Sequence, residues 1–137
     1  MRTSLAVVII GLALSACVRS TNALPNAFAG GWDLTPAACA DPDGVTRLGV
    51  DGSKLQYYEW GGDVVSARPD GAGSVRVALD WWSIDEVDTN DRAIVRRVPG
   101  KLTLSRDRSR LEVDIEGEVT SYIRCPGAPA GPDERQD

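Results

Sequence analysis

The sequence predicts an all-β protein: a single small antiparallel β-barrel of about eight strands, or a β-sandwich. Short runs in which apolar and polar residues alternate recur from residue 46 to residue 124. Clusters of glycine, proline and aspartate separate these runs at short intervals, which is typical of strands joined by tight turns. No stretch of this region has the length and the 3.6-residue periodicity of a helix. A chain of 137 residues supports one domain with one core.

The predicted strands are joined by segments that favour chain reversal. Asp51-Gly52 is typical of a two-residue hairpin turn. We interpret Gly61-Gly62-Asp63 as a break between strands and Pro99-Gly100 as a turn. In chain order, the predicted strands are residues 46–50, 54–60, 64–68, 74–82, 93–98, 101–105, 110–115 and 118–124.

The strand at 74–82 has the clearest alternation. Val75, Val77, Leu79 and Trp81 share one face, because successive side chains of a strand point to opposite sides. Trp82 must therefore point away from Trp81. We expect one of the two indoles in the core, and the other either on the surface or covered by the loop that follows.

That loop, residues 84–91, is acidic. Its carboxylates suit Ca²⁺, but counted from Glu86 the spacing fails at Asp91 and Arg97, where an EF-hand requires glycine and glutamate. We therefore predict a solvated connection and no metal. An exposed tryptophan beside such a loop is an anchor that interfaces favour. The predicted interaction surface consists of Trp82, Asp85, Glu86 and Asp88.

Composition argues against several functions. The net charge of −5, with arginines scattered among the acids, disfavours nucleic acid as a partner. The chain has no histidine, so it lacks the commonest general base and the commonest transition-metal ligand. It also lacks the Gly-x-Ser-x-Gly and Ser-x-x-Lys motifs of hydrolases. We predict neither an enzyme nor a bound cofactor.

The amino terminus resembles the signal peptide of a bacterial lipoprotein. Arg2 precedes an apolar stretch of about ten residues, too short to span a bilayer. Leu14-Ser15-Ala16-Cys17 then resembles a lipobox, in which the cysteine receives a diacylglyceryl group and the preceding peptide is removed. The alternatives are an ordinary secretory signal cleaved nearby and a short membrane anchor.

The lipobox resemblance divides the chain and implies a location. We expect a signal peptide at 1–16, a flexible tether at 17–27, the β domain at 28–125 and a disordered tail at 126–137. Acyl chains on Cys17 would hold the protein on the membrane. Val18 stands where an aspartate would signal retention in the inner membrane. The resemblance therefore implies the outer membrane, facing the periplasm.

Two cysteines remain for the domain. Cys39 and Cys125 lie near its two ends. In an exported protein, two leftover cysteines most economically form one disulfide, although two separate thiols remain the alternative.

The two ends of the domain resemble those of the calycin superfamily, the lipocalins and their small relatives. Gly30-Gly31-Trp32 opens the domain and Tyr122-Ile123-Arg124-Cys125 closes it. The resemblance implies a barrel in which Trp32 closes one end and Arg124 packs across the indole face. Trp32-Asp33-Leu34, followed by Cys39, also resembles the first strand of bacterial periplasmic metalloprotease inhibitors.

The stretch from Trp32 to Cys125 is also similar to a set of uncharacterised bacterial lipoproteins, which implies a fold and a location but no activity. We expect a surface binding or interaction module of the cell envelope, held by the membrane and partnered by an envelope protein. The alternatives are an inhibitor of an exported hydrolase, such as a protease or lysozyme, and a carrier of a small apolar ligand. Bulky inward residues predict a filled interior, which disfavours the carrier.

Overall fold

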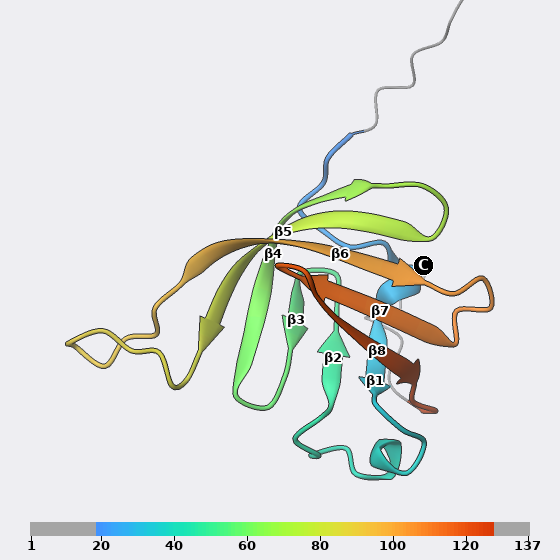
Figure 1. The fold of residues 1–137 in the computed structure, drawn as a ribbon, viewed down its shortest axis with the longest axis horizontal. Coiled ribbons are helices and arrows are strands. Elements are labelled where there is room, and N and C mark those ends of the chain that lie inside the picture. Colours follow the sequence, from blue (N-terminus) through green and yellow to red (C-terminus); the bar gives the residue numbers. More distant parts are fainter. Residues whose placement is uncertain (1–18, 128–137) are drawn as a thin grey trace, which may run out of the picture.

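The computed structural model describes residues 19–127, which form a closed barrel of eight antiparallel strands (Figure 1). Each strand pairs with the next, and β1 pairs with β8 through Trp32 opposite Arg124. The prediction of an all-β barrel is confirmed. The strands are β1 (Gly30–Asp33), β2 (Leu48–Val50), β3 (Lys54–Gln56), β4 (Trp60–Pro69), β5 (Ser74–Ser83), β6 (Arg96–Leu104), β7 (Arg110–Ile115) and β8 (Glu118–Arg124).

The barrel is filled at its centre. On β5, Val75, Val77 and Leu79 point inward and are buried, as the alternation predicted. They meet inward side chains from the other strands in one continuous core. The largest side chains that are fully buried are Trp32, Leu48, Leu55, Leu79, Leu102, Leu111, Val98 and Val113.

Gly61 and Gly62 do not break a strand, and that prediction is wrong. Both lie inside β4, paired with Trp82 and Trp81 of β5 respectively. A Cβ on Gly61 would lie 2.8 Å from Trp82 Cζ2, and one on Gly62 would lie 3.0 Å from Trp81 Cε3. The glycines are there because each leaves room for an indole, one on each face of the sheet. Residues 57–59, predicted as strand, form the connection between β3 and β4 instead.

Pro99-Gly100 is not a turn either, because β6 runs through it without interruption. Pro99 pairs with Ala78 of β5, while the pairing of β6 with β7 begins only at Gly100, opposite Ile115. Proline lacks an N–H to donate and is therefore tolerated where a neighbouring strand has ended. The glycine allows close packing, since a Cβ there would lie 2.9 Å from Ile115 Cδ1.

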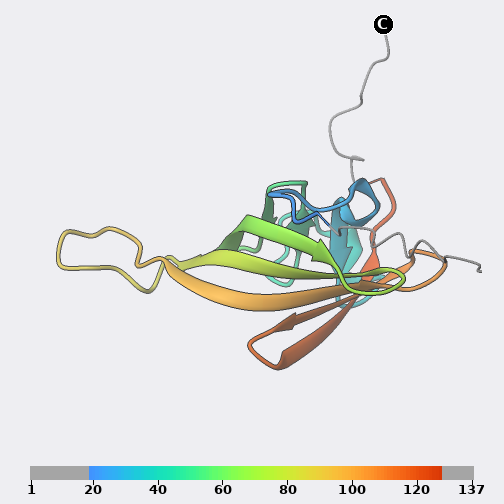
Figure 2. The same cartoon turned by 90° about the horizontal axis from the view of Figure 1, so that it is seen from above.

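The connection between β5 and β6 is longer than predicted. Residues 93–95, expected at the start of a strand, belong to it, and β6 begins at Arg96. The connection forms a long arm that projects from the barrel (Figure 2). We call residues 84–95 the arm.

The segment before the barrel contacts it, so the expected flexible tether is wrong from Thr21 onward. Thr21 and Ala67 exchange backbone hydrogen bonds, and the Leu24 amide donates to the carbonyl of Gly52. Leu24 and Phe28 are buried in the core, Phe28 at the end of the 3-10 helix η1 (Asn26–Phe28). The segment packs against the barrel because burial of the apolar Leu24 side chain is favourable, although the residues around it are polar.

The predicted signal peptide, Cys17 and residues 128–137 of the predicted tail lie outside the described residues. The anchor therefore stays a prediction.

Candidate functional site

The arm is a hairpin held by its own backbone. The Asp88 amide donates to the Arg92 carbonyl at 2.8 Å, and the Ile94 amide donates to the Glu86 carbonyl at 2.7 Å. Asp88 Oδ1 accepts from the amides of Asn90 at 2.7 Å and Arg92 at 3.1 Å, which fixes the tip. The arm therefore has a defined shape although it stands away from the barrel (Figure 2).

The arm presents apolar and acidic side chains together. Every one of its residues is exposed, and the large aliphatic ones are exposed by about half. Four carboxylates stand against one guanidinium, so the arm is negatively charged. The exposed aliphatic residues are Ile84, Val87, Ile94 and Val95, and the charged residues are Asp85, Glu86, Asp88, Asp91 and Arg92.

The four residues predicted as an interaction surface are only partly gathered. Asp85, Glu86 and Asp88 all lie on the arm, but one oxygen of Asp88 is engaged in its tip. Trp82 belongs to β5, where it is half-buried beside Gly61 on the outer face. Sequence reasoning did not find the aliphatic residues of the far side of the arm, because it assigned residues 93–95 to a strand.

One end of the barrel is closed around Trp32 and Arg124. The Arg124 guanidinium lies 4.1 Å from the Trp32 ring centroid and donates to the carbonyls of Ala27, Ala29 and Arg108 at 2.7–2.9 Å. Trp32 Nε1 donates to the Phe28 carbonyl at 3.0 Å. These contacts tie the segment before β1 to β8. Burial lowers the pKa of Arg124, with Arg108 adding to the effect.

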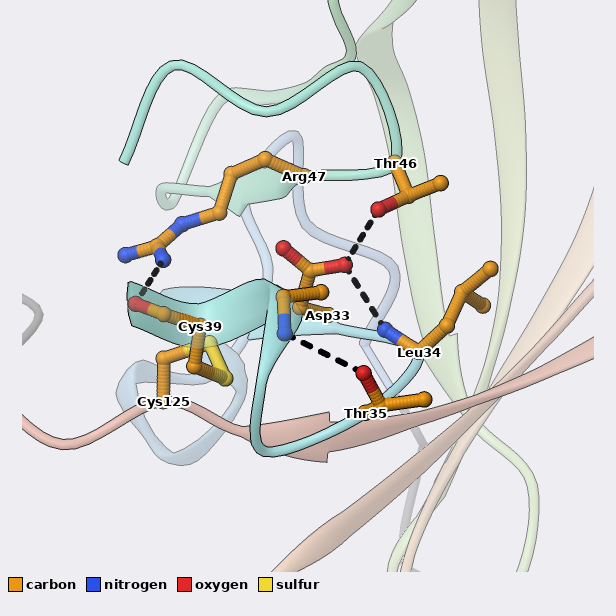
Figure 3. The surroundings of a disulfide bond; sticks show 8 residues. Asp33, Leu34, Thr35, Cys39, Thr46, Arg47 and Cys125 are labelled. Atoms are coloured by element: carbon orange, nitrogen blue, oxygen red, sulfur yellow. Dashed lines mark hydrogen bonds between the residues drawn. A yellow bond between two sulfur atoms is a disulfide. The ribbon is translucent and has the colours of Figure 1, made fainter. Parts of the chain in front are cut away.

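The predicted disulfide between Cys39 and Cys125 is confirmed (Figure 3). It joins the loop after β1 to the residue after β8. Beside it lies Asp33, fully buried, whose Oδ1 accepts from the Leu34 amide at 2.8 Å and from Thr46 Oγ1 at 2.6 Å. Asp33 therefore orders the loop between β1 and β2, which carries Cys39.

The end of the barrel beside the arm is open, which the sequence did not predict. It holds a pocket of about 380 Å³ with an aromatic floor. Tyr57 and Trp60 stack with ring centroids 3.6 Å apart, and Trp81 lies across Trp60 at 5.1 Å and 45°. We call this pocket the mouth. Its lining is Tyr57, Trp60, Trp81, Ser83, Arg96, Val113, Ile115, Glu116, Glu118, Thr120 and Tyr122.

The only sequence signals of the mouth were its aromatic residues and their places in the chain. Tyr57 begins the connection between β3 and β4 and Trp60 follows it, Trp81 lies near the end of β5, and Tyr122 lies in β8. In a meander, alternate connections lie at the same end, so these positions meet. Burial, with the neighbouring Tyr122, raises the pKa of Tyr57.

Comparison of the chain with protein-family models, with curated proteins and with solved structures gave no match. Residues 19–127 contain no helix with the length and apolar character needed to cross a bilayer. Nor do these residues hold a cluster of three or more side chains suited to a metal ion.

Proposed function

We propose that this protein is a binding module of the bacterial cell envelope, anchored through a lipid on Cys17, and that the arm binds its partner. The observation that carries the proposal is the arm itself: a hairpin braced by its own hydrogen bonds, with its aliphatic side chains in water. Exposed apolar groups that a rigid scaffold presents together are typical of interaction sites. The anchor and the outer-membrane location rest on the Leu14-Ser15-Ala16-Cys17 resemblance.

The charge of the arm selects the kind of partner. Asp85 and Glu86 are exposed and make no ion pair within residues 19–127. A partner that covers the arm must compensate these carboxylates, since a desolvated unpaired charge costs several kcal/mol. The arm therefore fits an exported or envelope protein with an apolar groove flanked by lysine or arginine side chains.

Site-specific photo-crosslinking in the native envelope tests this proposal. A photoreactive residue at Val87, on the arm, should give one crosslinked partner. The same residue at Val119, which is more exposed than Val87 and lies on the outer face of β8, should not. Asp85→Lys combined with Glu86→Lys should abolish the product, whereas Glu112→Lys on β7 should leave it intact. Crosslinking from Val119 and not from Val87 would contradict the proposal.

Inhibition of an exported hydrolase is the second candidate, favoured by the shape of the arm. A narrow hairpin with a fixed tip is able to enter an active-site cleft, and a tip held by Asp88 keeps its conformation on binding. Lysozyme and exported proteases, assayed with the purified chain, test this candidate. Inhibition that disappears with Asp85→Lys and Glu86→Lys would support it, and enzymes unaffected by the chain would contradict it.

The anchor has its own test. Metabolic labelling with a fatty acid should label the wild type and not Cys17→Ala, and the variant should leave the membrane fraction while it remains folded. Equal labelling of the two proteins, or an unprocessed wild type, would contradict lipidation.

A further inference from the structure

We propose that the mouth of the barrel binds a small organic cation, an alkylated or quaternary ammonium group, which it holds against Trp60 and Trp81. The site is separate from the arm, and the proposal does not depend on the function assigned to the arm. It rests on the aromatic floor, on the charges around it and on one unusual backbone conformation.

Three aromatic side chains, Tyr57, Trp60 and Trp81, form the floor of the pocket. Tyr57 stacks on Trp60 at an interplanar angle of 17°, so the two rings form one platform. Trp81 is inclined by 45° to Trp60 and by 59° to Tyr57 and makes a second wall. Trp60 remains 38% exposed, which is unusual for a large aromatic side chain at the end of a filled core. Ring faces carry negative electrostatic potential and attract cations, tryptophan most strongly.

The charged side chains of the rim favour the same ligand. Arg96 donates to Glu116 Oε2 at 2.7 Å across the opening, so its positive charge is already compensated. Glu118 lines the mouth as well and makes no ion pair within the described part of the chain. The mouth thus carries one uncompensated negative charge. This charge disfavours an anionic ligand and favours a cationic ligand over a neutral one.

Glu116 is held in a conformation that its residue type disfavours. Its φ is +55°, and Gly117 follows at +90°, so the pair forms the tight turn between β7 and β8. Asparagine, aspartate and glycine are the usual residues at the first of these positions. Glutamate there costs backbone energy, and its longer side chain reaches Arg96 at the rim. The strained turn keeps Arg96 paired and leaves Glu118 as the free carboxylate.

The size of the pocket agrees with a small ligand. A volume of about 380 Å³ is near the lower end of the range for small-molecule sites, about 300–1,000 Å³. The core beneath is closed, with Leu55, Leu79 and Val98 fully buried, so a ligand would rest on the aromatic floor and would not enter the barrel.

The test compares choline with 3,3-dimethylbutan-1-ol, its uncharged carbon isostere, on the purified full chain. Binding is followed by the broadening of the ligand methyl resonance in proton NMR. This signal does not depend on tryptophan fluorescence, so it can also be used for the variants that lack a tryptophan. We expect saturable binding of choline, and of tetramethylammonium, about tenfold tighter than that of the neutral alcohol. Equal binding of the two isosteres, or no saturable binding of either cation, would overturn the proposal.

Variants locate the site. Trp60→Leu should weaken choline binding about tenfold or more. Glu118→Gln, at an exposed position where folding is not at risk, should weaken it severalfold and reduce its dependence on salt. Trp82→Leu is the matched control, since Trp82 adjoins Trp81 in β5 but packs on the outer face against Gly61. A loss with Trp82→Leu as large as with Trp60→Leu, or unchanged binding in Glu118→Gln, would contradict the assignment.

Discussion

Gly62 lies directly opposite Trp81 across β4 and β5, and the missing side chain of the glycine is the space that the indole occupies. A Cβ at Gly62 would come within 3.0 Å of Trp81 Cε3 and 3.3 Å of Leu79 Cβ. The glycine therefore positions the wall of the mouth as well as the strand.

We expect Gly62→Ala to lower the free energy of unfolding by about 1–3 kcal/mol, because the added methyl overpacks a close contact. Urea denaturation measures it. Gly52→Ala, where a Cβ would meet nothing within 4 Å, is the control and should change stability by less than about 0.5 kcal/mol. Equal effects of the two substitutions would show that packing against Trp81 is not the reason for Gly62.

The contact between Gly62 and Trp81 also explains why the sequence predicted the barrel better than it predicted the strand boundaries. The alternation of β5 is read correctly from Val75 to Trp81, since one face of it is core. Gly61-Gly62 and Pro99-Gly100 are usual turn residues, and only the side chains of neighbouring strands show why they lie inside β4 and β6. Such contacts are long-range and leave no local pattern.

The candidate sites also differ in how far the sequence could predict them. The pairing of Cys39 with Cys125 could be predicted because the protein was expected to be exported and only these two cysteines remained for the domain. The acids of the arm were visible as a charged run, but the hairpin that presents Ile94 and Val95 was not, because those residues also suit a strand. The mouth depends on three connections, β3–β4, β5–β6 and β7–β8, that meet at one end of a closed barrel, which follows only from the order and register of the strands.

Arg124 should not be replaceable by lysine. Its guanidinium serves three carbonyls and the Trp32 face at once, and lysine lacks the planar fork that this geometry requires. Arg124→Lys is expected to lower the free energy of unfolding by about 2–4 kcal/mol. Hydrogen exchange should also speed up at the amides of Phe28 and Ala29. Arg110→Lys, at an exposed position on β7, is the control, and an equal loss in both variants would refute this role.

The disulfide should contribute strongly to stability. It links residues separated by 86 positions, and loop-closure entropy over that length corresponds to about 4–5 kcal/mol. Cys39→Ala combined with Cys125→Ala should lower the unfolding free energy by about this amount in chemical denaturation. Intact mass after alkylation without reductant provides the second measurement. Two alkylated thiols at Cys39 and Cys125 in the natively exported protein would contradict the pairing.

Asp107 gives a prediction of pH dependence. Hydrogen bonds from the Ser105 hydroxyl and from the Ser109 hydroxyl and amide lower its pKa to about 2. Because the folded pKa is depressed, this contribution to stability is present above the ordinary value of 3.8 and is lost as the pH falls towards 2. Carboxyl NMR titration should give a midpoint near 2. Ser105→Ala with Ser109→Ala should move it back towards 3.8, and a wild-type midpoint near 3.8 would be inconsistent with these bonds.

We propose that the arm binds the partner while the barrel carries the arm. The test replaces residues 85–94 by Asn-Gly, so that Ser83-Ile84-Asn-Gly becomes a four-residue connection compatible with the register in which Trp81 pairs with Arg96. The shortened protein and the wild type are then compared for thermal unfolding and for co-isolation of the partner that is crosslinked from Val87. We predict an unchanged unfolding temperature and complete loss of the partner. A shortened protein that stays folded and retains the partner at the wild-type level would contradict the claim.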